Sequence, residues 1–241
     1  DAWPPASAVP RSLYLREGGA LSFDAPASGT SGEAFDEYVS DPAQPAPFIE
    51  RLATDRTHDY MIQDQRFASR RPDVLVYETE PLSADLTVAG PIHSNLWVST
   101  TGTDSDFVVK LIDVYPDDAP ETAASTGTGL LRAGDSMAGY QQLVRGDVLR
   151  GKFRASLEKP EPFVPGEPTR IAFEMLDVLH TVRKGHRIPV QIQSSWFPLV
   201  DRNPQTFVDI YHATEADFQK ATERVYRSVD AASRVELNVV P

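Results

Sequence analysis

The segment RIPVQIQ, residues 187–193, alternates between apolar and polar side chains. Ile188, Val190 and Ile192 share one parity, and the polar residues occupy the other together with Pro189. Because successive side chains of a strand point to opposite faces of the sheet, this alternation predicts a half-buried β-strand. Proline cannot donate a backbone hydrogen bond, so Pro189 predicts a position near a sheet edge.

Similar short apolar segments recur along the chain at spacings of roughly 10 to 20 residues, which predicts an all-β fold. The predicted strands are 12–16, 20–24, 36–39, 74–77, 86–89, 94–100, 107–114, 169–178, 188–194, 208–212, 224–228 and 234–239. The first two are expected to form a hairpin. The 20 prolines divide the chain into short segments and disfavour long helices. Short helical turns are expected near 64–68, 136–144 and 214–223, and residues 115–168 are expected to be an insertion.

The length of 241 residues suits one large β-sandwich domain, 1–241, and 41% hydrophobic residues are enough for a substantial core. A formal net charge of −12 disfavours nucleic acid and anionic membrane surfaces as partners. No run of about 18 apolar residues predicts a membrane span, and the first residues show no targeting signal. The chain contains no cysteine, which excludes disulfides, thiolate nucleophiles and cysteine-ligated zinc.

No catalytic residue is predicted within this chain. A serine hydrolase of the α/β type needs its serine on a Gly-x-Ser-x-Gly turn, and the sequence has no such element. The nearest match, Gly29-Thr30-Ser31-Gly32, has the wrong spacing and lies in a polar turn.

No metal or cofactor is assigned either. The five histidines, at 58, 93, 180, 186 and 212, lack the spacing that lets two imidazoles share a metal ion. His180 and His186 flank a short turn and are interpreted as hairpin neighbours or as ordinary loop histidines. Acidic residues before and after one predicted strand could ligate calcium, but solvated turn carboxylates are the favoured interpretation. These residues are Asp104, Asp106, Asp117 and Asp118.

Asp113 ends the predicted strand DFVVKLIDV (106–114) with the same parity as Phe107. If that parity faces the core, a carboxylate enters the core and needs a partner. Arg150 and Arg154 are the candidate partners, and the alternative is a frayed strand end with Asp113 in water.

The tryptophans offer one further possibility, a platform on which sugar rings stack. Trp3, Trp97 and Trp196 lie in three separate contexts, and Trp97 is favoured as a packing residue of a strand.

Six segments of the sequence resemble one known protein family along nearly the whole chain. They are TGTDSDFVVKLIDVYPD (101–117), LRGKFRASLEKPEPFVPGEP (149–168), KGHRIPVQIQSSWFPLVDRNPQT (184–206), YETEPLSADLTVAGP (77–91), the DP-x-x-P-x-P loop (41–47) and ATERVYRSVDAASRVELNVVP (221–241). The first four resemble the C-terminal domain of the X-Pro dipeptidyl-peptidase and cocaine-esterase family. The last two are most similar to the branch of α-amino acid ester hydrolases and glutaryl-7-aminocephalosporanic acid acylases.

The resemblance implies a jelly-roll β-sandwich of the galactose-binding-like kind that follows an α/β-hydrolase domain bearing a Ser-Asp-His triad. No triad residue maps onto this sequence, which agrees with the missing serine turn. The expected partner is therefore an N-terminal catalytic domain outside this chain. The family includes secreted and periplasmic enzymes, and the compartment, substrate and oligomeric state stay open.

The resemblance also implies which residues face the partner. Pro47 and Phe48, in the proline-rich loop, are predicted to line the acyl side of the substrate pocket; the alternative is a loop packed on its own sandwich. The segment SSWFPLVDRNPQT is predicted to serve domain docking or its own turn structure. Its candidate residues are Trp196, Phe197, Asp201, Arg202 and Asn203.

Three functions compete at this point. The leading hypothesis is a non-catalytic domain that stabilises a serine hydrolase and helps to wall its substrate entrance. A free-standing carbohydrate-binding module is the alternative from another class. An independent esterase is the third, and we expect no ester hydrolysis by this chain alone.

Overall fold

The computed structural model describes residues 2–27, 34–51, 53, 55, 60–122 and 133–241. The strands are β1 (Val9–Leu15), β2 (Leu21–Ser22), β3 (Phe35–Ser40), β4 (Val74–Glu78), β5 (Leu86–Thr100), β6 (Asp106–Val114), β7 (Gln141–Arg150), β8 (Thr169–Val182), β9 (Pro189–Gln193), β10 (Ala221–Tyr226) and β11 (Arg234–Val240). The helical elements are α1 (Arg66–Ser69) and the 3-10 turns η1 (Glu17–Gly19), η2 (Tyr60–Ile62), η3 (Gly151–Phe153), η4 (Ile210–His212) and η5 (Glu215–Asp217).

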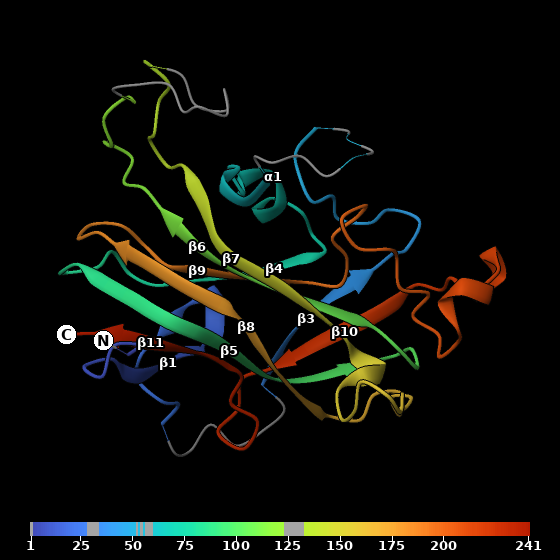
Figure 1. Ribbon diagram of the computed structural model, residues 1–241. Helices are drawn as coiled ribbons and strands as arrows, with labels where there is room; N and C mark the ends of the chain where they lie inside the picture. The colour runs from blue at the N-terminus through green and yellow to red at the C-terminus, as the bar shows by residue number, and fades with distance from the viewer. Residues whose placement is uncertain (1, 28–33, 52, 54, 56–59, 123–132) are drawn as a thin grey trace.

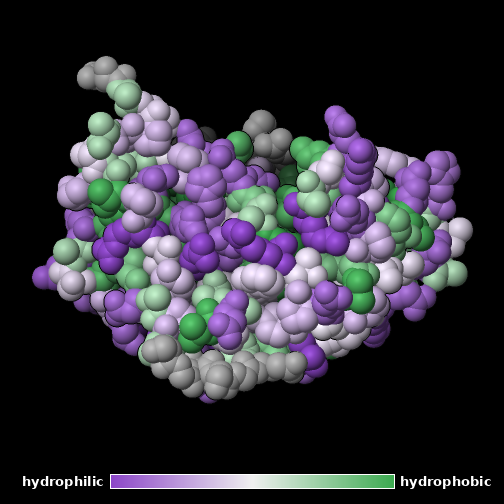
Figure 2. Space-filling view, turned by 90° about the horizontal axis from the view of Figure 1, so that it is seen from below, coloured by the Kyte–Doolittle hydropathy of each residue, from purple (hydrophilic) through white to green (hydrophobic). Residues whose placement is uncertain are grey.

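The strands form two antiparallel sheets, which confirms the predicted all-β sandwich. The larger sheet has the order β2-β1-β11-β5-β10-β3, with β8 on the other edge of β5, and the smaller has the order β4-β9-β6-β7. The two sheets face each other and the chain termini lie close together, next to the β1–β11 pair (Figure 1). On the side away from α1, hydrophilic residues alternate with small separate hydrophobic areas (Figure 2).

The main core fills the space between the sheets. Alternate residues of β6 and β9 point into it from the smaller sheet, namely Phe107, Val109, Leu111, Val190 and Ile192. The larger sheet contributes residues that include Leu13, Val88, Ile92, Leu96, Ile171 and Met175. Complete burial of such a side chain contributes about 1.5–3 kcal/mol, so the sandwich is held mainly by this layer.

A second apolar layer covers the outer face of the smaller sheet. It contains Phe48, Ile49, Tyr60, Val108, Ile112, Leu143 and Trp196. Figure 1 shows α1 and the neighbouring coil above this sheet. As a result β9 is buried on both faces, including Gln191 and Gln193. The predicted half-buried strand is therefore wrong, because the alternating sequence could not show that loops cover its polar face.

Pro189 was predicted near a sheet edge, and β9 is the second strand of the smaller sheet, between the edge strand β4 and β6. Pro189 is the first residue of β9 and pairs with Glu78 on β4, whereas pairing with β6 begins at Val190. The first position of a strand tolerates the missing donor.

The interpretation of 115–168 as an insertion is wrong as well, since β7 lies within it. β7 pairs with β6 from Asp106↔Arg150 to Val114↔Gln141, where a helical turn was predicted at 136–144. β7 is an edge strand with only Leu143 fully buried, so its apolar pattern is weak.

Three smaller differences concern local elements. The predicted strand 208–212 is wrong: η4 lies there, and Asp209 accepts a hydrogen bond from the Tyr211 backbone nitrogen. The helical turn predicted over 214–223 is limited to η5, and β10 follows it. The predictions of the β1–β2 hairpin and of a turn near 64–68 are confirmed.

Candidate functional site

The two segments that the sequence singled out lie side by side. Pro47 and Phe197 form a parallel β-bridge, and the Phe48 backbone nitrogen donates to the Phe197 carbonyl at 2.9 Å. The Phe197 nitrogen donates to the Ala46 carbonyl at 3.0 Å, and the Ala46 nitrogen donates to Ser195 Oγ at 2.7 Å. The fold therefore joins the proline-rich loop to the β9–β10 loop, which is about 150 residues away in sequence.

An apolar hollow of about 660 Å³, here called the proline hollow, opens between these two loops. Its lining residues are Pro45, Pro47, Phe48, Arg51, Ala53, Arg71, Phe197 and Pro198. Phe197 is 38% exposed, whereas Phe48 is 2% exposed because most of its ring packs in the layer over the smaller sheet. Sequence reasoning missed Pro45, Pro198 and Arg71; the Phe-Pro pair at 197–198 was the available signal.

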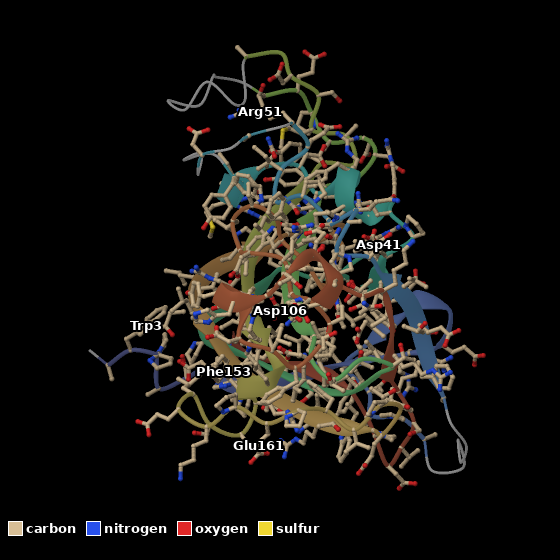
Figure 3. The ribbon with its side chains drawn as sticks, turned by 90° about the vertical axis from the view of Figure 1, so that its right-hand side faces the viewer. Trp3, Asp41, Arg51, Asp106, Phe153 and Glu161 are labelled. Carbon is tan, nitrogen blue, oxygen red and sulfur yellow. The ribbon has the colours of Figure 1, made fainter. Side chains whose placement is uncertain are left out.

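Arg71, one of the two arginines that line the proline hollow, is paired within the chain. Arg71 donates to both carboxylate oxygens of Asp73, at 2.8 and 2.7 Å, and to the Gln44 carbonyl at 3.0 Å. Arg51 lies toward the upper end of the molecule, and Asp106 lies near the centre (Figure 3). With the Arg71 charge paired, the prolines and Phe197 dominate the hollow, and an apolar group fits it best.

Trp196 does not reach the surface, so it cannot itself contact a docked domain in this structure. It is 4% exposed and packs against Tyr60, with ring centroids 6.1 Å apart. Beneath it lies Lys110, fully buried on β6, with Nζ 5.4 Å from the Trp196 ring centroid. Lys110 Nζ donates to Gln65 Oε1 at 3.1 Å, and burial lowers the pKa of Lys110 to about 7.

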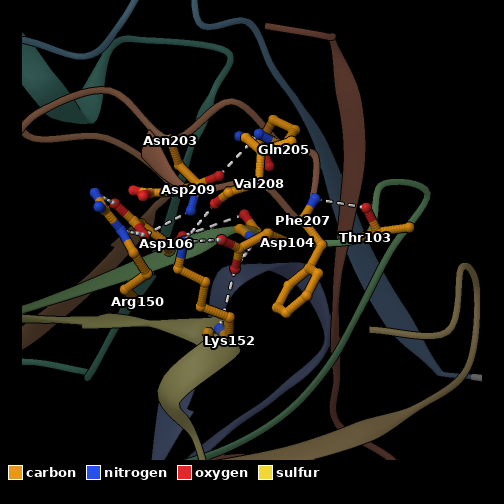
Figure 4. Close-up of polar contacts among 12 residues, drawn as sticks. Thr103, Asp104, Asp106, Arg150, Lys152, Asn203, Gln205, Phe207, Val208 and Asp209 are labelled. Atoms are coloured by element: carbon orange, nitrogen blue, oxygen red, sulfur yellow. Dashed lines mark hydrogen bonds and ion pairs between the residues drawn. The ribbon is translucent and has the colours of Figure 1, made fainter. Parts of the chain in front are cut away.

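Asn203 lies next to Asp106 and Arg150 (Figure 4), and Asp201 contacts the same arginine. Asp201 Oδ1 accepts from Arg150 Nη2 at 2.8 Å, and Asn203 Nδ2 donates to Asp106 Oδ1 at 2.8 Å. The Gln205 backbone nitrogen in turn donates to Asn203 Oδ1 at 2.8 Å. These contacts favour the internal-turn alternative for both residues.

Arg202 also contacts its own chain. It donates to the Pro42 carbonyl at 3.0 Å, and its guanidinium lies 4.7 Å from the Phe218 ring centroid. The proline-rich loop is thus held at a second point by the β9–β10 loop.

The predicted partners of Asp113 are wrong, as is the alternative that leaves it in water. Asp113 is 2% exposed and is bonded by His180 Nε2 at 2.8 Å and by His186 Nδ1 at 2.7 Å. Arg150 is paired with Asp106 instead, and Arg154 donates hydrogen bonds to backbone carbonyls of its own loop. The two histidines on either side of one turn were the signal that could have identified this cluster.

Asp104 and Asp106 are buried, so the interpretation as solvated turn carboxylates is wrong for both. Arg150 donates to both oxygens of Asp106 at 3.0 Å, and the Lys152 backbone nitrogen donates to Asp104 Oδ1 at 3.0 Å. Burial and the neighbouring charge of Asp106 raise the pKa of Asp104 to about 6. In the described part of the chain, no three His, Asp or Glu side chains are arranged to hold a metal ion.

The remaining candidates give no further site. Trp97 is half-buried in β5, and Trp3 Nε1 donates to Asp177 Oδ2 at 2.5 Å, so the tryptophans lie in different parts of the fold. The Gly29–Gly32 turn and His58 lie outside the described residues. Among the described helices, none has the length and apolar character needed to cross a bilayer.

Comparisons with known proteins agree with this geometry. Residues 1–236 match the family described as the X-Pro dipeptidyl-peptidase C-terminal non-catalytic domain. A cocaine esterase of Rhodococcus sp. (strain MB1 Bresler) is 31% identical over 99% of this chain and 39% of its own length. The crystal structure of an aminopeptidase from a marine sediment Thaumarchaeota archaeon has a TM-score of 0.90 and 42% identity, covering 100% of this chain and 38% of that one.

An α-amino acid ester hydrolase structure is similar to the same degree. Its TM-score is 0.86 at 42% identity, and the match covers 99% of this chain and 38% of that one. The chain therefore spans less than two fifths of the length of these relatives.

Proposed function

The chain belongs to the family of X-Pro dipeptidyl-peptidase C-terminal non-catalytic domains, and from this premise we propose that it serves an N-terminal serine hydrolase domain in a longer protein. In this role it stabilises the catalytic domain and helps to wall the substrate entrance. The serine nucleophile and its base belong to that partner.

The proline hollow is the observation that supports this proposal. Its surface is made of prolines and aromatic rings held by two cross-bonded loops, so little conformational entropy is lost when a group docks there. Such a wall suits an apolar acyl or aryl portion of an ester or amide substrate.

The test uses the longer protein that contains this chain. Phe197→Ala removes the most exposed ring of the hollow, and it should change the ratio of kcat/KM between an aromatic ester and an acetyl ester by about tenfold. Tyr211→Ala is the matched control, because Tyr211 lies on the same β9–β10 loop, is 89% exposed and does not line the hollow.

Equal ratios for the wild type and both variants would exclude the wall role. The stabilising role is measured separately: removal of this chain from the longer protein should lower its melting temperature, and an unchanged temperature contradicts that role.

A further inference from the structure

Glu223, on β10, is a fully buried carboxyl group at the centre of the fold. Thr100 Oγ1 donates to its Oε1 at 2.9 Å. Its other oxygen, Oε2, has no hydrogen-bond partner among the described residues. A buried carboxylate in this position would have donors on one side only, from Thr100 and Ser105, and would lack the solvation that an ionised group needs.

The charged neighbours of Glu223 make ionisation less favourable still. Asp104 and Asp106 are buried beside it on the β5–β6 connection and the start of β6. The neighbouring positive charges are paired with those two aspartates. Arg150 is bonded to Asp106, and Lys152 Nζ lies 3.8 Å from Asp104 Oδ2. In the described residues, no Lys, Arg or His nitrogen lies within 4.0 Å of the Glu223 carboxylate, so three carboxyl groups share two cations.

On the β3 side, Tyr38 lies opposite Glu223 in the sheet register, and the acidic Asp36 of the same strand is bonded to Tyr77 and Arg227. Tyr38 donates or accepts a hydrogen bond with Ser194 Oγ at 2.7 Å and brings no positive charge. Burial, followed by the charges of Asp104 and Asp106, raises the pKa of Glu223 to about 8.

Gln205 connects this carboxyl group to the β9–β10 loop. With its amide group turned by 180°, so that the nitrogen faces the acceptors around it, Gln205 donates to Glu223 Oε1 at 3.1 Å and to Ser105 Oγ at 3.0 Å, and its oxygen accepts from Ser40 Oγ at 2.7 Å. Gln205 has a φ of 63°, the only positive φ of a non-glycine residue among those described. Such a conformation persists only where surrounding contacts hold it.

The backbone of Gln205 is held as tightly as its side chain. Its carbonyl accepts from the Thr103 nitrogen at 3.0 Å, and a Cβ on Gly102 would lie 2.2 Å from that oxygen. Figure 4 shows the neighbouring bonds, with Phe207 N donating to Thr103 Oγ1 and Lys152 Nζ donating to the Val208 carbonyl. Segment 203–208 is therefore attached to the sandwich through Thr103 and Lys152, and it contacts Glu223 through the Gln205 side chain.

We propose that Glu223 is a neutral carboxylic acid in the folded chain at neutral pH, and that its proton makes the attachment of segment 203–208 to the sandwich pH-sensitive. Opening of this segment lets water reach Glu223, which then ionises. The proposal goes beyond the accessory role above and does not depend on it, because it concerns only residues of this chain.

The direction of the pH effect follows from the two states. The pKa of Glu223 is higher in the closed, folded state than its ordinary value of 4.5. The closed state therefore holds the proton that the open state loses between these two values, so its stability is greatest at low pH and decreases as the pH rises toward about 8.

Infrared difference spectroscopy of the 241-residue chain tests the protonation directly. At pH 7 the wild type should show the C=O band of a buried carboxylic acid, and Glu223→Gln should lack it. Glu37→Gln is the matched control, because Glu37 lies on the adjoining strand β3 with its side chain 51% exposed, and the band should persist there. Absence of the band in the wild type, or its persistence in Glu223→Gln, would overturn the proposal.

Hydrogen exchange measured by mass spectrometry tests the attachment. After correction for the intrinsic rate, protection of residues 203–208 should decrease by about tenfold per pH unit between pH 6 and pH 8 in the wild type and in Glu37→Gln. Protection in Glu223→Gln should not depend on pH, because the amide cannot ionise. A constant protection in the wild type, or the same slope in Glu223→Gln, contradicts the proposal even if that variant is less stable.

Discussion

The two ends of strand β6 carry buried carboxylates that are held in different ways. Asp106 begins the strand, and Arg150 of the adjacent strand β7 lies directly opposite it in the sheet. Asp113, near the other end, is opposite Gln142, so its partners come from elsewhere: His180 from β8 in the larger sheet and His186 from the connection before β9.

The difference shows that strand register supplies a partner at one end and sheet packing at the other. The Asp106–Arg150 pair lies within one sheet and orders the β9–β10 loop through Asn203. The Asp113 cluster joins the two sheets across the sandwich. An arginine remains charged at all accessible pH values, so the loss of its carboxylate partner leaves a buried charge unpaired. A histidine ring can donate a hydrogen bond without carrying a charge.

The largest effect is expected at the start of β6. Asp106→Ala leaves the Arg150 guanidinium partly buried with only the exposed Asp201 as a partner, and it should cost about 3–5 kcal/mol of unfolding free energy. Urea unfolding of the purified chain measures this loss. A loss similar to that of an exposed carboxylate variant would show that the register pair is unimportant.

A smaller loss is expected at the other end. Asp113→Ala removes the shared hydrogen-bond partner of two histidines and should cost about 2–3 kcal/mol, less than at Asp106 because an imidazole, unlike a guanidinium, need not carry a charge. The same unfolding measurement applies, with Asp117→Ala, beyond the end of β6, as the control. If Asp113→Ala costs more than Asp106→Ala, the comparison above is reversed.

The middle of β6 should respond in the opposite direction. Lys110→Met replaces a buried amine with an apolar side chain and should stabilise the chain by ~1 kcal/mol at pH 6. Because burial lowers the pKa of Lys110 to about 7, the folded wild type loses this proton at lower pH than the unfolded chain does. Wild-type stability from this group therefore rises from about pH 7 to its ordinary pKa of 10.5, and the advantage of methionine shrinks over that range.

The measurement is the difference in unfolding free energy between Lys110→Met and the wild type at several pH values. Lys159→Met, at an exposed position, is the control and should show no such trend. A difference that is constant from pH 6 to pH 10 would contradict the assignment of the trend to Lys110.

The smallest effect is expected at the second partner of Arg150. Asp201 is 55% exposed, so Asp201→Asn should cost only ~0.5 kcal/mol although its contact with Arg150, at 2.8 Å, is shorter than that of Asp106. The unfolding free energies of the two single variants measure both costs, and the double variant shows whether the two costs are additive. A cost equal to that of Asp106→Ala would show that burial does not decide the difference.

The strand pattern of the sequence predicted most of the fold because alternation is a local property. It failed for β7, whose edge position leaves few buried residues, and for β9, whose glutamines are covered by loops. The resemblance brought attention to the proline-rich loop and to Phe197, which line one hollow, and also to Trp196, which is buried because tertiary packing places it over the smaller sheet.

The amino-acid sequence by itself determined the strand-rich character of this chain, its acidic surface charge, and the family to which it is related. These depend on composition, short-range periodicity and motifs. Tertiary structure decided which side chains meet: Asp113 with two histidines, Arg150 with Asp106, and Glu223 with Thr100. These pairings follow from strand order and loop packing, which bring together residues far apart in the sequence, such as Pro47 and Phe197, and no local pattern encodes such contacts.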